Sequence, residues 1–418
     1  MSKKIALVHY TAPPVVGGVE SVLGHHARLM AAAGHQVTVI AGRDANINDH
    51  TQFSHVPLAD SRHPAVLAAK AHLDEGHVPA DFEQLVVKIA ESLQMIVAGM
   101  DVVIAHNVCS LHKNLALTAA LRRVCAAPAA PHLIMWHHDL AWTTPRYHSE
   151  LYDGWPWDLI RQEWPEVRPR HVVVSELRCR ELAKLLAIAP DAISVVPSGL
   201  DVAEFLKLEP QTAGLVHKLH LLEAAPLLLL PVRITRRKNI ELALRTLAAM
   251  RDVMPQATLV VTGPPGPHNP SNQIYFEELK RLRAELGLTP TTSESGPVAH
   301  FLTEILDTYL PDAVIGDLYR LADALFLTSR EEGFGIPALE AGLVGLPVFC
   351  ADIPALREIT GDWVTRFTTD ADPAVLADLL STRLQNDPVF QLRRRVRQTY
   401  TWEQIYVKCI APLLEVER

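Results

Sequence analysis

The stretch ADALFLTSREEGFGIPALEAGLVGLPVFCA, residues 322–351, is expected to form a strand, a loop, a helix and a second strand in direct succession. ADALFLT and LPVFCA are short apolar runs, which indicate strands buried on both faces. Between them, Pro337 suits the first position of a helix and Gly345 suits its end. Two buried strands joined by a helix form a βαβ unit, so this stretch predicts a parallel sheet.

The same alternation of apolar runs and helical patterns extends over almost the whole chain. The runs are 5–10, 35–41, 101–107, 132–138, 171–176 and 192–198, then 226–232, 257–263, 322–328 and 346–351. Because 418 residues exceed one ordinary core, we expect two doubly wound, Rossmann-like α/β domains in tandem, 1–205 and 206–397. The helical pattern at about 398–418 would pack back on the first domain. A ligand would bind in an interdomain cleft, at the carboxyl ends of both sheets.

The composition describes a mildly acidic chain without a membrane signal. Lys and Arg total 39, Asp and Glu total 47, and the formal net charge is −8. Nucleic-acid partners are therefore not expected, and anionic lipid would meet only the small patch Arg161, Arg168 and Arg170. No apolar run is as long as a membrane span and the five cysteines lack metal-type spacing, so we expect a cytoplasmic protein. Sixteen of the twenty histidines lie within residues 1–200, for which the sequence gives no physical reason.

Two glutamates lie at the start of the helix predicted after residue 335. Glu332 precedes it, in the loop formed by Gly333, Phe334 and Gly335, and Glu340 lies about one turn inside it. A helix N-terminus stabilises acidic side chains, which is a sufficient structural reason for both. Alternatively, two acceptor side chains beside free backbone N–H groups suit a ligand that carries hydroxyls and phosphate.

Two cations follow the apolar run 226–232. Arg233 stands at the expected strand end, and Lys238 stands just before a helical pattern for which Asn239 is a plausible cap. Fixed positive charge at this position could hold a pyrophosphate without a metal. The alternative is a solvated basic loop, since Arg236 and Arg237 resemble surface residues.

Polar residues and glycines follow two strands of the first series. His137, His138 and Asp139 follow one strand end, but a metal site would need further ligands that the sequence does not cluster, so no metal site is predicted. A histidine there would bond to a substrate or be satisfied in the domain wall. Gly17 and Gly18 open a helix, either as a tight turn or to let the backbone approach a ligand.

Five segments, in this order and spacing, resemble the family 4 retaining glycosyltransferases (glycosyl transferase group 1) of the GT-B type. They are GGVE (17–20), WHHD (136–139), VVPSGLD (195–201), RITRRKN (233–239) and EEGFGIPALEAGLVGLPVF (331–349). The most specific part is the E-x7-E signature at Glu332 and Glu340. Ser198 stands where the family usually has Asn, and residues 289–316 are longer than the usual link, which leaves recognition of the nucleotide base open.

The resemblance implies roles for the residues of the second domain. Arg233 and Lys238 would grip the donor diphosphate. Glu332 would hold hydroxyls of the donor sugar and Glu340 the ribose of the nucleotide. The backbone amides of Gly333, Phe334 and Gly335 would meet the transferred sugar. Gly263 would also bind the substrate.

The resemblance also implies roles for the first domain. His138 would line the reaction centre, and Asp139 would bind substrate beside it. Gly17 and Gly18 would form the glycine loop near the phosphates and the acceptor. These residues would thus face the acceptor.

The implied reaction is transfer of a hexose from a nucleotide diphosphate sugar to an acceptor hydroxyl, with retained anomeric configuration and no metal or other cofactor. The donor could be a UDP-, GDP- or ADP-sugar, and the acceptor is not named by the sequence. A nucleotide-sugar epimerase, a glycoside phosphorylase and a non-catalytic nucleotide-sugar binder are alternatives, because one fold supports several functions.

Overall fold

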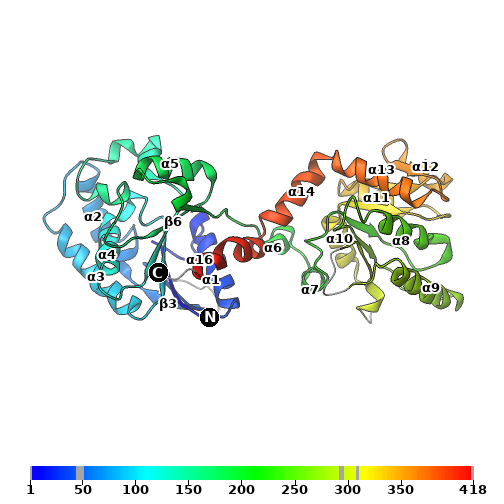
Figure 1. Ribbon diagram of the computed structural model, residues 1–418, viewed down its shortest axis with the longest axis horizontal. Helices are drawn as coiled ribbons and strands as arrows, with labels where there is room; N and C mark the ends of the chain where they lie inside the picture. The colour runs from blue at the N-terminus through cyan, green and yellow to red at the C-terminus, as the bar shows by residue number, and fades with distance from the viewer. Residues whose placement is uncertain (1, 44–50, 291–295, 307–309, 416–418) are drawn as a thin grey trace. The chain divides into compact units, whose positions relative to one another are not determined.

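The computed structural model describes residues 2–43, 51–290, 296–306 and 310–415 (Figure 1). The chain forms two compact units. The first comprises Met1–Leu200 with Tyr400–Arg418, and the second comprises Asp201–Thr399.

The first unit contains, among its described residues, a seven-stranded sheet in which every neighbouring pair is parallel. Its strand order is β3-β2-β1-β4-β5-β6-β7, which is the Rossmann order extended by one strand. The strands are β1 (Lys4–Val8), β2 (Gln36–Ala41), β3 (Thr51–His55), β4 (Val102–His106), β5 (His132–His137), β6 (Arg170–Val173) and β7 (Ile193–Val195).

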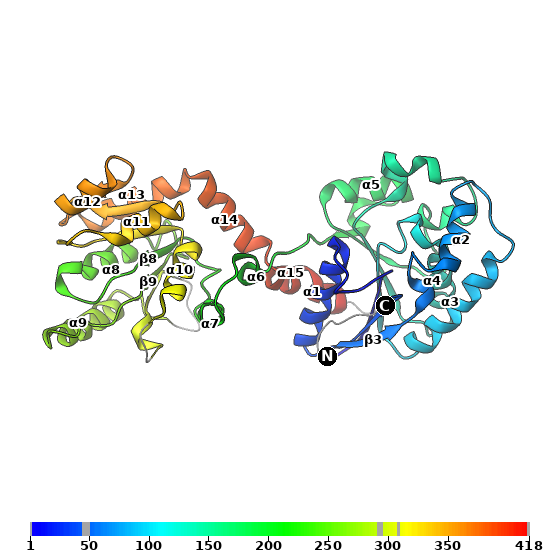
Figure 2. The same cartoon turned by 180° about the vertical axis from the view of Figure 1, so that it is seen from behind.

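Alternation of side chains along β1 divides the core of this unit between the two faces of the sheet. Ala6 and Val8 pack with α2 (Pro64–Leu73), α3 (Phe82–Val97) and α4 (Leu115–Cys125). Ile5 and Leu7 pack on the other face with α1 (Gly18–Ala32) and the C-terminal helical segment. That segment consists of α15 (Trp402–Ile405), a π-helical turn (Tyr406–Ile410) and α16 (Ala411–Glu415), and it lies beside α1 in both views (Figures 1 and 2). The remaining α-helix, α5 (Glu176–Leu186), follows β6.

The second unit repeats this architecture with a six-stranded parallel sheet, counted over its described residues. The strand order is β10-β9-β8-β11-β12-β13. The strands are β8 (Leu227–Leu230), β9 (Thr258–Val261), β10 (Val298–Phe301), β11 (Ala324–Leu327), β12 (Val348–Ala351) and β13 (Thr365–Phe367). Right-handed crossovers in this order place helices on both faces of the sheet.

The helices of the second unit share one continuous core with the sheet. They are α6 (Val202–Leu206), α7 (Pro210–Lys218), α8 (Ile240–Ala249), α9 (Ser271–Glu285), α10 (Asp312–Leu321), α11 (Ile336–Leu343), α12 (Pro354–Thr360), α13 (Pro373–Gln385) and α14 (Pro388–Thr399). The prediction of two doubly wound α/β domains is confirmed. The βαβ unit within residues 322–351 is β11, α11 and β12, with Pro337 in the first turn of α11.

Three strands were not predicted from the sequence, and all three lie at a sheet edge. They are β3, β10 and β13, and β13 has only three residues. The segment 289–316 was expected to be a long link, yet it contains β10 and the start of α10. An edge strand needs fewer apolar residues, so its signal in sequence is weak.

No helix in the described part of the chain is both long enough and apolar enough to cross a bilayer.

Candidate active site

The predicted residues of the second unit gather where the order of its strands reverses, between β8 and β11. In an open parallel sheet this topological switch point leaves a crevice at the carboxyl ends of the strands, where ligands bind. The loop after β8 carries Arg233 and Lys238, and the loop after β11 carries Glu332. Adjacency of β8 and β11 in the sheet therefore brings together residues 94 positions apart in sequence.

The centre of this site is an ion pair between Lys238 and Glu332. The Lys238 ammonium donates to both Glu332 carboxylate oxygens at 2.6 Å, and the two side chains are 10% and 8% exposed. Ser329 Oγ donates to Glu332 Oε1, also at 2.6 Å. Burial lowers the pKa of Lys238, and the bond to Glu332 opposes that effect. The pair thus holds both charges in a poorly solvated position, ready to meet polar groups of a ligand.

Backbone contacts hold the two loops against each other. Thr328 Oγ1 donates to the Lys238 carbonyl oxygen at 2.9 Å, and the Arg330 amide donates to the Arg237 carbonyl oxygen at 2.8 Å. Arg237 itself is half exposed and reaches Glu332 at 3.8 Å. The site is therefore built on paired loops rather than on one mobile segment.

Asn239 is the N-cap residue of α8, as predicted, but its side chain does not make the capping bond. Its backbone is left-handed, with φ 52°. Its amide instead donates to the Thr369 carbonyl oxygen and accepts from Arg330. The side chain is buried and ties the Lys238 turn to two other loops, so it supports the site rather than the helix.

Arg233, Gly263 and Glu340 line one cavity of about 280 Å³, whose lining does not include Lys238 or Glu332. The other walls come from the end of β8, from α10 and from the first turn of α11, including Ile315 and Ile336. Arg233 is exposed and has no hydrogen bond or ion pair within the described parts of the chain. A free guanidinium, a carboxylate and apolar walls in one concavity suit an organic anion.

Two glycines shape the backbone of this site. A Cβ on Gly263 would lie 2.3 Å from the Val232 carbonyl oxygen, so only glycine fits between the ends of β9 and β8. Gly335 has φ +102° immediately before α11, in the left-handed region that other residues avoid. Gly333 and Phe334 are exposed, and a Cβ on Gly333 would meet nothing within 4 Å.

One residue near Glu340 was not among the predicted site residues. Tyr319 of α10 is 3% exposed; burial first, and then a hydrogen bond to Glu340, raise the pKa of its hydroxyl. The hydroxyl also lies 3.4 Å from the Pro337 carbonyl oxygen. Nothing in the local sequence of α10 marks this tyrosine, because its partner is on another helix.

In the first unit, His138 follows β5 and lies in a network of histidines. Its Nε2 shares a hydrogen bond of 3.2 Å with His106 Nδ1, and His106 is fully buried. The His9 Nδ1–H donates to the His106 carbonyl oxygen at 2.7 Å. Burial lowers the pKa of His138 to about 3, so the imidazole is neutral near pH 7. A neutral ring can donate or accept a hydrogen bond but carries no charge.

Asn107 fixes the backbone on which His138 and Asp139 stand. It has φ 57°, and its Oδ1 accepts from the His138 and Asp139 amides at 2.7 and 3.1 Å. The Asp139 carboxylate lies 3.3 Å from Arg178 of α5. An Asn directly after an apolar strand was the available signal for Asn107, since Asn adopts the left-handed conformation more readily than most residues.

Gly17 and Gly18 begin α1, as predicted, but a carboxylate of the chain already occupies that helix end. A Cβ on Gly17 would lie 2.0 Å from Glu20 Oε2, whereas one on Gly18 would meet nothing within 4 Å. Glu20 accepts from Thr11 at 2.6 Å and lies 3.8 Å from His9 Nε2. Its hydrogen bond with His9 is the largest effect that lowers the pKa of Glu20 to about 2.

Among the described residues, one cluster has the ligand types of a metal site, away from the predicted site residues. Asp74, His112 and Glu150 have ligand atoms within 4.8 Å of one another. The Lys70 ammonium lies among them, 2.6 Å from Asp74 and 3.1 Å from Glu150. A fixed ammonium takes the place of a cation there, so the cluster is a salt-bridge network.

Comparison with known proteins places this arrangement in a class. The family model described as Glycosyltransferase Family 4 matches residues 16–204, and the model described as Glycosyl transferases group 1 matches residues 217–400. The two matches together cover nearly the whole chain and correspond to its two doubly wound α/β domains, the architecture of GT-B glycosyltransferases. The chain belongs to the group 1, family 4 glycosyltransferases.

The individual relatives have low sequence identity to this chain. Mannosylglucosylglycerate synthase of Petrotoga mobilis is 25% identical over 379 residues, 85% of this chain and 84% of that protein. D-inositol 3-phosphate glycosyltransferase of Thermomonospora curvata is 31% identical over 238 residues, 54% of this chain and 50% of that protein. The solved structure of sucrose-phosphate synthase from Thermosynechococcus elongatus aligns over 99% of this chain and 98% of its own, with 18% identity and a TM-score of 0.37.

Proposed function

We propose that this glycosyltransferase moves a hexose from a nucleotide diphosphate sugar to an acceptor hydroxyl, with retention of anomeric configuration and without a metal. The observation that carries the proposal is the Lys238–Glu332 pair at the switch point of the second sheet, with Arg233 in the same loop after β8. A nucleotide diphosphate sugar carries both groups that such residues bind: its diphosphate would contact Arg233 and Lys238, and its sugar hydroxyls would donate to Glu332. The names of the two relatives, which describe glycoside synthesis and sugar transfer, agree with this class of reaction.

On the donor side, Arg233 and Lys238 would contact the diphosphate, and Glu332 would accept hydrogen bonds from the sugar. Glu340, in the same cavity as Arg233, would accept from the ribose. The close fit of Gly263 against the Val232 carbonyl keeps a side chain out of this cavity. The exposed amides of Gly333 and Phe334 would lie against the transferred sugar.

The chemical step would break the bond from the anomeric carbon to the phosphate oxygen and form a bond to the acceptor oxygen on the same face. The departing phosphate would take the proton of the acceptor hydroxyl. Arg233 and Lys238 would stabilise the negative charge that develops on that phosphate. Glu332 orients the sugar and is not a nucleophile in this proposal.

On the acceptor side, the first unit would supply neutral polar contacts. His138 is uncharged near pH 7 because it is buried, and Asn107 fixes its backbone. The Glu20 carboxylate at the start of α1 disfavours a second anion at that point and favours a hydroxyl. Gly18, which faces open space, would let the acceptor approach the backbone.

The test is a panel of UDP-, GDP- and ADP-sugars in a thermal-shift assay, followed by product analysis with acceptor hydroxyl compounds. A bound donor raises the melting temperature by mass action, and transfer gives a glycoside of retained configuration. Epimerised donor without acceptor, or a sugar phosphate formed from inorganic phosphate, would replace the proposal with an epimerase or a phosphorylase. Binding without any turnover would show a non-catalytic binder.

A second test concerns the metal. Transfer is expected to continue in EDTA, since two fixed cations face the diphosphate. A strict requirement for Mg²⁺ or Mn²⁺ would disprove this part of the proposal.

A further inference from the structure

A cavity of about 860 Å³ lies at the amino edge of the first sheet. Its lining includes residues that precede or begin four strands: Lys3 before β1, Asp101 before β4, His132 at the start of β5 and Arg170 at the start of β6. His138 follows the carboxyl end of β5, so this cavity is at the opposite edge of the sheet from the acceptor-side residues. Its volume is within the range of small-molecule sites.

The described residues of the cavity lining carry more positive than negative charge. Lys3, Arg168 and Arg170 line it. The Lys3 ammonium and the Arg168 guanidinium form no hydrogen bond or ion pair within the described parts of the chain. Arg170 donates to the Leu413 carbonyl oxygen of α16, a neutral partner, at 3.0 Å.

The two carboxylates of the lining are already engaged. Asp101 Oδ2 accepts from the Lys4 amide at 2.7 Å, and Glu166 pairs with Arg122 at 2.5 Å. Glu166 is therefore paired with a cation outside the lining, whereas Asp101 keeps its negative charge and offsets one of the three positive charges. Like charges that converge on one concavity repel one another, and an anion of two or more charges relieves that repulsion.

Backbone geometry at the rim gives a second, independent observation. Arg168 and Ala129, both in the lining, have φ of 51° and 59°. The left-handed conformation is uncommon for such residues and is often found at binding sites. At Arg168 it coincides with a side chain that has no hydrogen bond or ion pair to another described residue.

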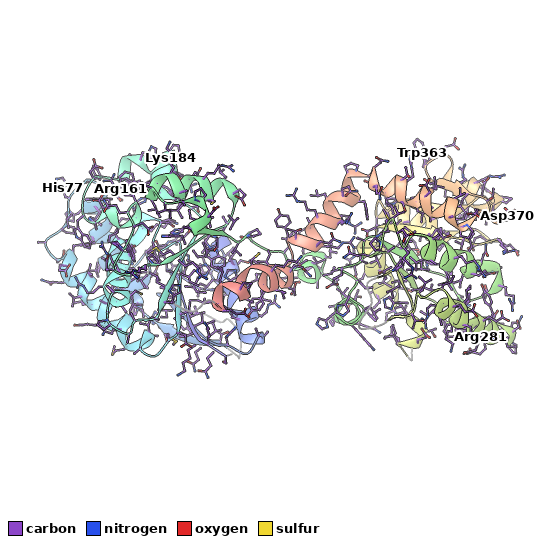
Figure 3. The ribbon with its side chains drawn as sticks, viewed as in Figure 1. His77, Arg161, Lys184, Arg281, Trp363 and Asp370 are labelled. Atoms are coloured by element: carbon purple, nitrogen blue, oxygen red, sulfur yellow. The ribbon has the colours of Figure 1, made fainter. Side chains whose placement is uncertain are left out.

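The third basic residue of the sequence patch is not part of this site. Arg161 lies in the same unit (Figure 3), but it pairs with Asp153 and Asp158 and stacks over Trp142. The patch expected from the sequence therefore divides, and Lys3, 165 positions before Arg168, completes the cluster of cations. Apart from His132, the rest of the lining is apolar, and part of it is small, for example Ala126, Ala127 and Pro131.

We propose that this cavity binds a phosphate-bearing small molecule, with Lys3, Arg168 and Arg170 around the phosphate and the small apolar residues around its organic part. Arginine and lysine together match a phosphate dianion, since Arg donates in a planar fork and Lys as a point charge. The concave shape favours a soluble ligand over a lipid surface.

The test uses the full chain with inorganic pyrophosphate as the probe, because the donor-side cations can bind pyrophosphate as well. Hydrogen–deuterium exchange should show protection in segments 126–131 and 166–170, separately from any protection in 231–239. Lys3→Gln with Arg168→Asn should abolish the first protection and keep the second; Asn tolerates the left-handed conformation. Calorimetry should show at least about tenfold weaker binding at this site, as expected when charge-assisted bonds are lost.

A matched control removes the same amount of charge elsewhere. Lys4→Gln with Lys184→Gln, the latter on α5 (Figure 3), should leave the protection of 126–131 and 166–170 unchanged. If the control variant lost the protection equally, the effect would come from the lower net charge alone, and the proposal would be overturned. A lower melting temperature of the Lys3/Arg168 variant without any change in pyrophosphate binding would also overturn the proposal. The two cations would then only stabilise the C-terminus of α4, whose carbonyl groups carry partial negative charge.

A final arm separates a free phosphate from a lipid headgroup. Vesicles of phosphatidylcholine with phosphatidic acid are sedimented with the wild type and with the Lys3/Arg168 variant. The proposal expects no difference between the two proteins. Binding to vesicles that requires Lys3 and Arg168, without protection by pyrophosphate, would overturn it in favour of a membrane contact.

Discussion

The two glutamates of the E-x7-E signature have different surroundings, and these predict different kinetic effects. Glu332 is in the buried pair with Lys238, whereas Glu340 is exposed in the cavity with Arg233. If Glu332 orients the reacting sugar, Glu332→Gln should lower kcat more than it raises the donor KM. If Glu340 holds a ribose that does not react, Glu340→Gln should mainly raise KM.

Steady-state kinetics on both variants, with melting curves to check folding, measures this difference. If both residues only stabilise the start of α11, each change should cost about 0.3–1 kcal/mol of stability and leave both constants near wild type. The reverse pattern, with kcat lost only in Glu340→Gln, would show that the two roles are exchanged.

Gly263 gives a prediction about space rather than charge. Gly263→Ala places a Cβ 2.3 Å from the Val232 carbonyl oxygen, and neither backbone can move without disturbing β8 and β9. We expect a loss of about 1–3 kcal/mol in the free energy of unfolding, together with weaker donor binding. Gly333→Ala is the control, because its Cβ would meet nothing within 4 Å. Denaturant unfolding measures the free energy of unfolding of both variants. An equal loss in Gly263→Ala and Gly333→Ala would contradict the prediction.

The C-terminal helical segment is a structural element of the first unit. Ile410 is 1% exposed and packs in the same core as Leu7 and Leu23, more than 380 residues earlier in the sequence. We therefore expect Ile410→Ala to lower the free energy of unfolding by about 2–5 kcal/mol. Tryptophan fluorescence during urea unfolding measures this change.

Val407 offers a matched control on the same segment. It is 68% exposed, so Val407→Ala should change the stability by less than about 0.5 kcal/mol. A small effect of Ile410→Ala, comparable to that of Val407→Ala, would mean that the segment contributes little to the first core.

Buried histidines make the folding stability of the first unit sensitive to acid. Burial lowers the pKa of His26 and His138 to about 3, and it places the pKa values of His106 and His137 well below the usual range. In the unfolded chain these groups titrate near 6.5. The unfolded state thus binds more protons below pH 6.5, so stability is full above that pH and declines as pH falls toward 3.

The measurement is urea unfolding by tryptophan fluorescence between pH 7.5 and 4.5. Six of the seven tryptophans belong to the first unit, and the seventh, Trp363, is 93% exposed (Figure 3). Each fully buried histidine contributes a slope of up to about 1.4 kcal/mol per pH unit. His26→Phe keeps the aromatic packing on Trp136 and should flatten the slope; an unchanged slope would show that His26 does not titrate on unfolding.

The concentration of histidines in residues 1–200 thus has a structural setting. His9, His106 and His138 form consecutive hydrogen-bonded contacts, and His137 bonds to His171. The sequence contained the count but no spacing that predicts these contacts.

Local patterns were enough to predict the two parallel domains, the start of α11 to within one residue (Ile336 rather than Pro337) and the presence of charged residues at strand ends. Apolar runs and helix signals act over a few residues, and a parallel sheet follows from their alternation. The edge strand β3 was missed because none of its residues is buried, so it does not require a continuous apolar run. β10 is mostly buried but has only four residues, one of them His300, which makes its apolar run short.

Pairing of distant residues was decided by the tertiary structure. Lys238 and Glu332 meet because β8 and β11 are neighbours in the sheet, and no local pattern specifies that strand order. Asn239 is suited by type to cap a helix, yet its buried side-chain amide is hydrogen-bonded to the Thr369 carbonyl oxygen and to the side chain of Arg330 instead. Local propensity thus set the elements, whereas strand order and the need to satisfy buried polar groups set the contacts that make the site.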